Sequence, residues 1–489
     1  MTTLRKSVLI TFLSSNGATV ISFATILVLS RLLTPAEVGI FSMTAAMVAF
    51  AHTFREFGIS GYIQQEKDLT DEKLRAATGV MVASSLTMGA LLFAGSGWLA
   101  DYFKQPGIRS VMQVLAVGFV FIPLGAITNA LLSRELRARE QALASIAGVL
   151  TYNVSVLVLA YAGFSYMSMA WANLLNIIVS GISLSFFRPP GKPWMPSLRG
   201  WRGVVRFGGG SIIGSVVTSI NNALPDLMLG KMGSARDVGL LSRANATAGI
   251  FMQVAGPAVN YAVVPFMSRK HHAGDELHTP LAQACSYLTV LSWPPLLVTA
   301  LFARDIVVML YGWQWVDSAP VVAALCLLTA VALAFNFHQW TLIAIGRPYL
   351  AIIPNGFLLL ARVATILVVY DGSLGSFAWG LAWAGVLSIP LNMYLQSTVF
   401  GLTLRRFLSA LFPTTLVTLV CAVAAAILHV TLPADWHPAA RLSVLAVTMS
   451  AVWFVALFLV RHPVVAELEK IALKAPRLHG ALGRFWIKT

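Results

Sequence analysis

Among the polar side chains that lie inside otherwise strongly apolar stretches, seven are candidates for function. They are Arg55 and Glu56, Asn222 and Asp226, Arg243 and Asn245, and Arg362. A charge at the middle of a membrane costs roughly 2.5–3.5 kcal/mol on insertion scales, so each needs a structural or functional reason. Guanidinium groups bind phosphate and carboxylate oxygens, and a carboxylate can take up a proton or cation. These residue types are therefore candidates either for structural ion pairs or for a cavity that binds an anionic ligand.

The segment around Asp226 has the most informative spacing. Asn222 and Asp226 are four residues apart, so they share one face of a helix. Pro225 has no N–H and frees a backbone carbonyl one turn earlier, which can bend the helix or leave an acceptor exposed. Arg243 follows across a short turn and predicts an antiparallel neighbour of Asp226. Two interpretations stay open: a structural ion pair, or two side chains lining a cavity and changing partners as the protein moves.

The other basic residues also have two interpretations each. Arg362 has no acid in its own apolar segment, so its partner must be an anionic ligand or a carboxylate on another helix. Arg55 and Glu56 end a span, where long side chains can snorkel to the interface. Arg134, Arg137 and Arg139 are either topology-setting charges or a site for lipid phosphates.

Catalytic, metal and cofactor sites are not predicted. Gly208 to Gly210 is not followed by the Lys-Ser/Thr of a phosphate-binding loop. His271 and His272 lie in a polar loop without cysteine or a second ligand pair, which argues against zinc. All three cysteines fall in apolar segments and are expected in the core.

Composition indicates the solvent that surrounds this chain. Of 489 residues, 57% are hydrophobic and 11% are charged, whereas soluble domains carry about 25% charged residues. Repeated apolar runs of 18 or more residues are typical of an all-α, polytopic membrane protein. About fourteen transmembrane helices are predicted, near residues 7–30, 36–56, 77–100, 108–132, 142–163, 165–187, 207–230, 238–266, 281–303, 319–344, 349–370, 374–397, 408–430 and 441–460.

An internal repeat organises these spans. LVLSRLLTPAEVGIFS (27–42) returns without a gap as LMLGKMGSARDVGLLS (227–242). Because six helices return the chain to its starting side, the halves form a parallel repeat, as in transporters with a substrate path between two lobes. The predicted units are a six-helix lobe (1–190), a proline-rich connector (191–206), a second six-helix lobe (207–400), two further helices (401–460) and a basic tail (461–489).

The distribution of Lys and Arg predicts the orientation. They concentrate on the side of the membrane that holds the N-terminus, above all in 188–206 and beyond Arg461. The positive-inside rule then places both termini in the cytoplasm. The net charge of +15 is therefore attributed to the excess of Lys and Arg that sets the membrane topology and attracts anionic lipids. It does not indicate nucleic-acid binding.

Several motifs carry a family resemblance. SRLLTPAEVGIF (30–41), FREFGISGYIQQ (54–65), LLSRELRARE (131–140), residues 222–239 and MLYGWQWVDSAPVV (309–322) resemble the bacterial polysaccharide flippases. This is the polysaccharide-transporter branch of the multidrug/oligosaccharidyl-lipid/polysaccharide exporter superfamily. The resemblance implies translocation of an undecaprenyl-pyrophosphate-linked oligosaccharide from the inner to the outer leaflet of the cytoplasmic membrane by alternating access. It also implies polysaccharide polymerase or chain-length proteins as partners.

With that expectation, the polar residues inside the spans receive roles. Arg362, Arg243, Arg55, Asn222 and Asn245 are assigned to a substrate cavity, because the pyrophosphate needs cations and hydrogen-bond donors. Asp226 and Glu56 are assigned to ion coupling or gating, with a proton or sodium as the ion.

Three other functions stay open. A lipid II flippase and a cation-coupled multidrug exporter would share the fold, although basic residues in the spans outnumber acids and favour an anionic cargo. A membrane polymerase or ligase would need a sizeable external loop with catalytic residues. The longest external connection, Arg304 to Ala319, has acids only at its opposite ends and is not expected to fold. An enzyme is therefore not predicted.

Overall fold

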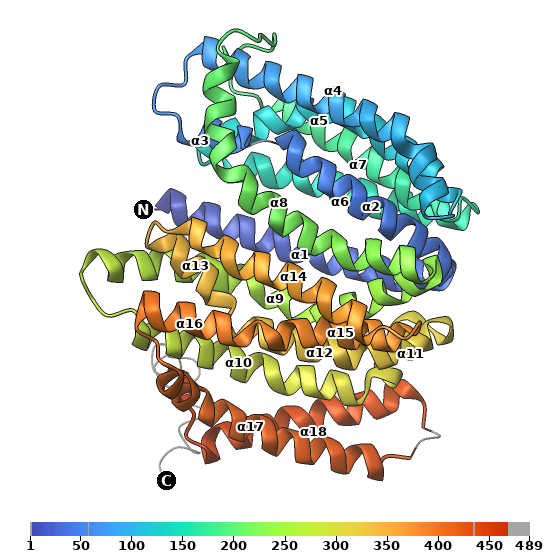
Figure 1. Ribbon diagram of the computed structural model, residues 1–489, viewed down its shortest axis with the longest axis vertical. Coiled ribbons are helices and arrows are strands. Elements are labelled where there is room, and N and C mark those ends of the chain that lie inside the picture. The colour runs from blue at the N-terminus through green and yellow to red at the C-terminus, as the bar shows by residue number, and fades with distance from the viewer. Residues whose placement is uncertain (1, 57, 434–435, 468–489) are drawn as a thin grey trace.

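The computed structural model describes residues 2–56, 58–433 and 436–467, and every regular element in them is a helix (Figure 1). The first half contains α1 (Thr2–Leu32), α2 (Pro35–Glu56), α3 (Ile59–Gln65), α4 (Asp71–Tyr102), α5 (Gly107–Arg134), α6 (Ala138–Tyr161) and α7 (Met167–Phe186). The second contains α8 (Trp201–Met232), α9 (Ala235–His272), α10 (His278–Leu301), α11 (Ala303–Tyr311), η1 (Trp313–Ser318), α12 (Ala319–Ala334), α13 (Asn336–Ala344), η2 (Pro348–Ala351), α14 (Ile352–Val369), α15 (Leu374–Leu387) and α16 (Ile389–Phe400). Two further helices follow, α17 (Leu404–Thr431) and α18 (Pro438–Leu459).

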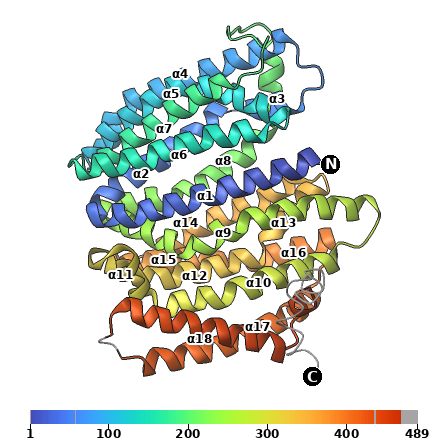
Figure 2. The ribbon, with the colours of Figure 1, turned by 180° about the vertical axis from the view of Figure 1, so that it is seen from behind.

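The helices lie roughly side by side in a bundle with two distinct ends. One end carries the α1–α2 and α8–α9 turns and is called the turn end. The other carries the 187–200 connection and is called the connector end. Figures 1 and 2 show α2 to α7 on one side of the bundle, the second half in the middle and α17–α18 at the opposite edge. We call the first half the N-lobe and the second half the C-lobe.

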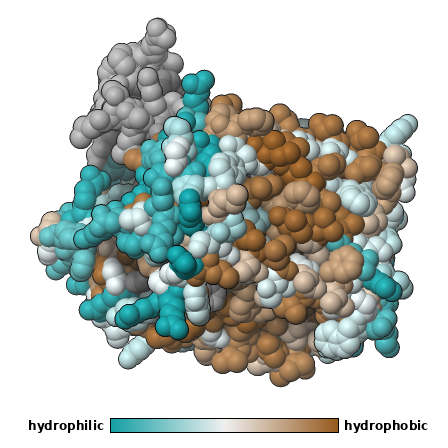
Figure 3. All heavy atoms as spheres, turned by 90° about the horizontal axis from the view of Figure 1, so that it is seen from above, coloured by the Kyte–Doolittle hydropathy of each residue, from teal (hydrophilic) through white to brown (hydrophobic). Residues whose placement is uncertain are grey.

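The surface is that of a membrane protein. In the described residues, twelve helices or broken helices are long and apolar enough to cross a membrane, and α1 adds an apolar stretch from Gly17 to Leu32. Figure 3 shows a hydrophobic band with hydrophilic residues gathered most densely at one end. The prediction of an all-α polytopic membrane fold is confirmed, and each of the fourteen predicted spans contains a helix or a broken helix.

Several spans differ from their predicted form. The second predicted span does not end at Glu56, because α3 continues it to Gln65 beyond Gly58, which has φ 68°. The spans predicted at 319–344 and 374–397 are each broken into two helices, the latter at Ser388, two residues before Pro390.

The connection from Arg304 to Ala319 is folded, contrary to expectation. It forms α11 and η1, whose acids pair with arginines from elsewhere in the chain. Asp305 lies 2.9 Å from Arg441 of α18, and Asp317 lies 2.6 Å from Arg236 of α9. Local apolar pattern did not reveal this fold, because its contacts come from residues distant in sequence.

The predicted connector is shorter than expected, since α8 already begins at Trp201. Residue 197 packs tightly on α4: its N–H donates to the carbonyl of Arg75 at 3.0 Å. A Cβ added at Gly79 would lie 2.3 Å from the Ser197 oxygen, so only glycine permits this approach. The connector is thereby fixed against the N-lobe. Of the predicted tail, residues 468–489 lie outside the described residues.

His462 holds α17 and α18 to the C-lobe at the connector end. The backbone N–H of Val464 donates to Nδ1 at 3.2 Å, so Nε2 carries the proton and lies 3.1 Å from the hydroxyls of Ser286 and Thr414. Only 1% of the side chain is exposed. Burial lowers the pKa of His462 from 6.5 to about 4. The neutral ring is therefore part of the packing.

We expect acid to weaken this attachment. Between pH 6.5 and 4 the unfolded chain protonates His462 while the folded protein does not, so stability is full above pH 6.5 and falls through this window. The loss reaches up to roughly 3 kcal/mol, at about 1.36 kcal/mol per pKa unit. Melting temperatures of wild type and His462→Asn between pH 7.5 and 4.5 test it. A wild-type protein that loses no more stability than the variant would contradict it.

Candidate functional site

The two lobes meet at the turn end through the repeated segments. Helices α2 and α9 cross there, with Gly39 against the first residue of α9 and Gly239 against the first residue of α2. A Cβ added at Gly39 would lie 1.7 Å from the Ala235 oxygen, and one at Gly239 would lie 1.8 Å from the Pro35 oxygen. The two backbones are therefore in direct contact, and the arrangement is reciprocal.

The helices that cross are capped in the same way. The N–H of Thr34 donates to Glu37 at 2.7 Å, and the N–H of Ser234 donates to Asp237 at 3.0 Å. The hydroxyls of Thr34 and Ser234 accept from the N–H groups of Glu37 and Asp237 in return. Both copies thus form a capping box, which explains why the repeat exchanges Thr for Ser and Glu for Asp without loss.

Hydrogen bonds between the lobes reinforce this contact of α2 with α9. The carbonyl of Ser30 at the end of α1 accepts from the indole Nε1 of Trp315 at 2.6 Å and from the Gln314 amide. Arg31 donates to the Met309 carbonyl at 3.3 Å, and Lys231 donates to the Tyr102 carbonyl at 2.9 Å. Because Trp315 is fully buried, the turn end is sealed between the lobes.

Arg243 lies on α9 beneath this seal. Its guanidinium is 5.1 Å from the ring centroid of Trp315 and 5.8 Å from that of Tyr311. The side chain is 5% exposed, its Nε has no hydrogen-bond partner, and no carboxylate pairs with it in the described residues. A buried cation held by aromatic faces can bind an anion, since its donors are not used.

Asp226 does not meet Arg243. No ion pair joins them, so the ion-pair interpretation is wrong. The reason is that α2 packs on both α8 and α9, while α9 turns Arg243 toward α11 and η1. Asp226 is partly buried, and within the described residues no hydrogen bond or ion pair to it is found.

Arg362 of α14 is bound to the carbonyl that Pro225 frees. Because residue 225 has no N–H, the carbonyl of Asn221 lacks its helical donor. Arg362 Nη1 donates to this oxygen at 2.6 Å and lies 3.3 Å from Asn221 Oδ1. Asn221 Nδ2 donates back to the Asn355 carbonyl of α14 at 2.7 Å. The partner of Arg362 is therefore neutral, not the carboxylate that was considered, and its Nε stays without a partner.

Arg55 is buried within the N-lobe and does not snorkel. It is 8% exposed, and its Nη1 lies 3.3 Å from the sulfur of Met81 on α4. Glu56 beside it is exposed, and no ion pair joins the two. The snorkelling alternative fails because α3 extends the span beyond Arg55. Asn222 and Asn245 are both exposed side chains, one on each of α8 and α9.

Among the described residues, no hydrogen bond or ion pair joins any two of the predicted site residues. Arg243, Arg362 and Asp226 all belong to the C-lobe, whereas Arg55 belongs to the N-lobe. Sequence reasoning missed Asn221, which binds Arg362, and the aromatic residues Tyr311 and Trp315 around Arg243. Pro225 was the available signal for Asn221, since the residue four positions before a helical proline has the free carbonyl.

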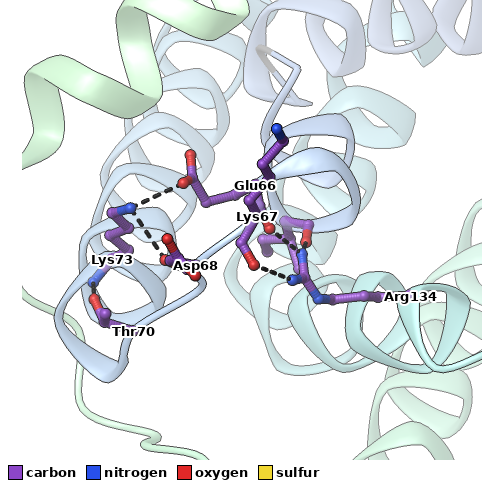
Figure 4. A network of polar contacts seen from close by, with 7 residues as sticks. Glu66, Lys67, Asp68, Thr70, Lys73 and Arg134 are labelled. Carbon is purple, nitrogen blue, oxygen red and sulfur yellow. Dashed lines mark hydrogen bonds and ion pairs between the residues drawn. The ribbon is translucent and has the colours of Figure 1, made fainter.

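The basic cluster where α5 ends and α6 begins is mostly engaged in protein contacts. Arg134 donates to the carbonyls of Ile63 at 2.7 Å and Glu66 at 2.5 Å, which completes the end of α3 (Figure 4). Lys73 binds Glu66 at 2.8 Å, and this hydrogen bond lowers the pKa of the Glu66 carboxyl. Arg137 pairs with Glu140 at 2.8 Å. These contacts favour a structural role over the lipid-phosphate alternative for Arg134 and Arg137.

Sequence comparisons match this chain to proteins of polysaccharide biosynthesis. The model of a family described as "Polysaccharide biosynthesis protein" matches residues 28–320. Lipopolysaccharide biosynthesis protein WzxC of Escherichia coli is 22% identical, over 91% of each chain. Succinoglycan biosynthesis transport protein ExoT of Rhizobium meliloti is 24% identical, over 82% of this chain and 81% of its own.

Solved structures share the fold. Lipid II flippase MurJ, in an inward closed conformation, superimposes with a TM-score of 0.74 at 13% identity, over 93% of this chain and 99% of its own. An inward-facing multidrug transporter of the MATE family gives a TM-score of 0.62 at 16% identity, over 81% and 94%. At these identities, the likeness concerns the fold alone.

Proposed function

Since this chain belongs to the family of polysaccharide biosynthesis proteins and is a membrane transport protein rather than an enzyme, we propose that it flips a lipid-linked oligosaccharide. The cargo is an undecaprenyl-pyrophosphate-linked repeat unit, carried from the inner to the outer leaflet of the bacterial cytoplasmic membrane. The product serves the synthesis of a surface polysaccharide. Both termini are then cytoplasmic, and the turn end faces outward.

The observation that carries this proposal is the buried, ion-pair-free Arg243 directly below the sealed turn end. A cargo with a pyrophosphate needs a cation that is not neutralised by the protein, because charge-assisted bonds to phosphate oxygens are the strong ones. In this proposal, a headgroup that enters between the lobes from the cytoplasm stops at Arg243. The lipid tail stays in the bilayer during this movement.

Alternating access supplies the movement. In this proposal the seal of Gly39, Gly239 and Trp315 opens as the lobes separate at the turn end and approach at the connector end. Arg362 and Arg55 line the path from either lobe, with Asn222 and Asn245 as neutral donors. Asp226, for which no partner is found in the described residues, takes up a proton or sodium ion, and Glu56 contributes to gating at the cytoplasmic side.

A deletion strain tests the proposal. We expect loss of surface polysaccharide, with intact lipid-linked repeat units that stay on the inner leaflet, as measured by leaflet-specific labelling. Repeat units that reach the outer leaflet without polymer would instead indicate a polymerase or ligase. Unchanged polysaccharide with altered drug sensitivity would indicate drug export. Either result would contradict a flippase for this cargo.

Arg243→Gln should reduce export strongly. A hydrogen bond to a charged group is worth about 1.5–3 kcal/mol, so transport at limiting cargo should fall roughly 10- to 150-fold at normal protein level. Arg405→Gln, which removes an exposed arginine of α17, is the matched control. Equal transport by the two variants would remove Arg243 from the cargo site.

A further inference from the structure

A cavity lies inside the N-lobe, away from Arg243. It measures about 690 Å³ and lies between α1, α5, α6 and α7. Its lining from α5 to α7 comes from Asn129, the first turns of α6 and the last turns of α7, so the cavity is at the connector end. In Figure 2, α1 and α6 are close near the turn end and separate toward the N-terminus.

The lining is polar but uncharged. Ser22, Asn129, Gln141, Ser145 and Ser180 contribute hydroxyl and amide groups, and the described lining includes no acidic or basic side chain. The remaining wall is apolar, with Phe23, Ile26 and Leu184 among its residues. Amides and hydroxyls beside an aromatic ring match a sugar, which has hydroxyls at its edge and C–H groups on its faces.

The polar groups are held in position by one another. Gln141 Nε2 donates to Asn129 Oδ1 at 2.8 Å and to Ser133 Oγ at 2.7 Å. Ser180 Oγ donates to Asn176 Oδ1 at 3.1 Å. A Cβ added at Gly148 would lie 1.9 Å from Ser180 Oγ, so this glycine lets α6 and α7 approach closely. A preorganised set of this kind lowers the entropic cost of binding.

One buried acceptor next to the cavity has no partner in the protein. Asn153 of α6 is 3% exposed and donates to the Val149 carbonyl at 2.7 Å, with its Nδ2 3.5 Å from Ser22 Oγ. Its Oδ1 is buried and without a hydrogen-bond partner among the described groups. A buried acceptor left unpaired costs about 1–3 kcal/mol, which a hydroxyl donor entering beside Ser22 would offset.

We propose that this cavity is a saccharide-binding site that takes the uncharged, hydroxyl-rich part of the lipid-linked cargo before it reaches Arg243. The proposal rests on the proposed function. An acyl chain is a poor occupant, because it would leave the amides and hydroxyls unsatisfied. A phosphate is equally unsuitable, because the lining offers no cation. Recognition of sugar and of pyrophosphate is thus divided between the two sites.

Two variants test the site. Gln141→Met removes the amide at nearly constant volume, and Ser145→Phe fills the cavity from an exposed position without removing any hydrogen bond described above. Gln113→Met, on α5 and outside the cavity lining, is the matched control. Each protein is purified in lipid nanodiscs. Its affinity is measured for two probes: lipid-linked repeat units extracted from the deletion strain, and undecaprenyl pyrophosphate without sugar.

We expect both variants to bind the repeat-unit lipid at least about ten-fold more weakly, the equivalent of one hydrogen bond, with unchanged affinity for the sugar-free lipid. Unchanged affinity for the repeat-unit lipid would overturn the saccharide site. An equal loss for both probes would overturn it too, because the cavity would then act on the pyrophosphate or on the fold. If the wild-type protein itself binds no repeat-unit lipid, the proposed function fails first, and this site fails with it.

Discussion

Replacing Gly39 by alanine should force the two lobes apart at the turn end and stop transport. The added Cβ would lie 1.7 Å from a backbone oxygen of α9, a distance that no side-chain adjustment can relieve. Overpacking costs typically about 1–3 kcal/mol. Here this cost destabilises only the state in which the turn end is closed. That state should lose population roughly 5- to 150-fold relative to the state open at the turn end. Gly239→Ala should have the same effect.

The measurement is the reaction of a cysteine placed at Leu33 with a membrane-impermeant reagent, in cells and alongside polymer export. Leu33 is 2% exposed beneath the seal and should become accessible in the variants. Gly97→Ala is the control, since a Cβ there meets nothing within 4 Å. If the Gly39 variant exports normally and its Leu33 position stays protected, the contact at the turn end is not the gate.

Arg362→Met should destabilise the protein in a way that Pro225→Ala reverses. Removing the guanidinium leaves the Asn221 carbonyl without a donor, at a cost of about 1–3 kcal/mol. Alanine at 225 restores a backbone N–H four residues after Asn221, so the carbonyl no longer depends on Arg362. Melting temperatures of the wild type, both single variants and the double variant give the coupling energy. We expect the loss from Arg362→Met to be much smaller in the Pro225→Ala background.

The same four proteins separate structure from cargo binding. If Arg362 also contacts the pyrophosphate, the double variant should be stable but still export poorly. If it recovers export together with stability, Arg362 acts only by holding α8 to α14. A coupling energy near zero would mean that the bond between Arg362 and the Asn221 carbonyl contributes nothing to stability.

Much of the fold was predictable because hydrophobic length and the repeat are local signals. The repeat identified the α1–α2 and α8–α9 units, and the capping boxes show why its substitutions are conservative. The extension of the second span through α3 was missed because Arg55 and Glu56 interrupt the apolar run, whereas the helix break at Phe335 was missed because the apolar run continues across it. The folding of α11 and η1 was missed because it depends on Arg441 and Arg236, which lie far away in sequence.

The candidate site was predictable in its residue types and not in its pairings. Burial of Arg55, Arg243 and Arg362 follows from their place in apolar spans. The partners of these arginines could not be predicted, because they are a sulfur, two aromatic rings and a carbonyl freed by proline. Such groups leave no charge pattern in the sequence. The expectation that cations in spans seek carboxylates was therefore too narrow, and hydrogen-bond accounting around Pro225 would have been more informative.

The reciprocal crossing of Gly39 and Gly239 has a consequence for which side chains the two halves can hold at equivalent positions. It is the geometry of an isologous interface, in which two identical subunits would meet across a two-fold axis. In such a homodimer every substitution appears twice, so a buried arginine near the axis would face its own copy. In this fused chain the equivalent of Arg243 is Met43, which is fully buried in the other half. Covalent fusion thus permits a single positive charge close to the axis, where a symmetric pair of subunits would have to hold two or none.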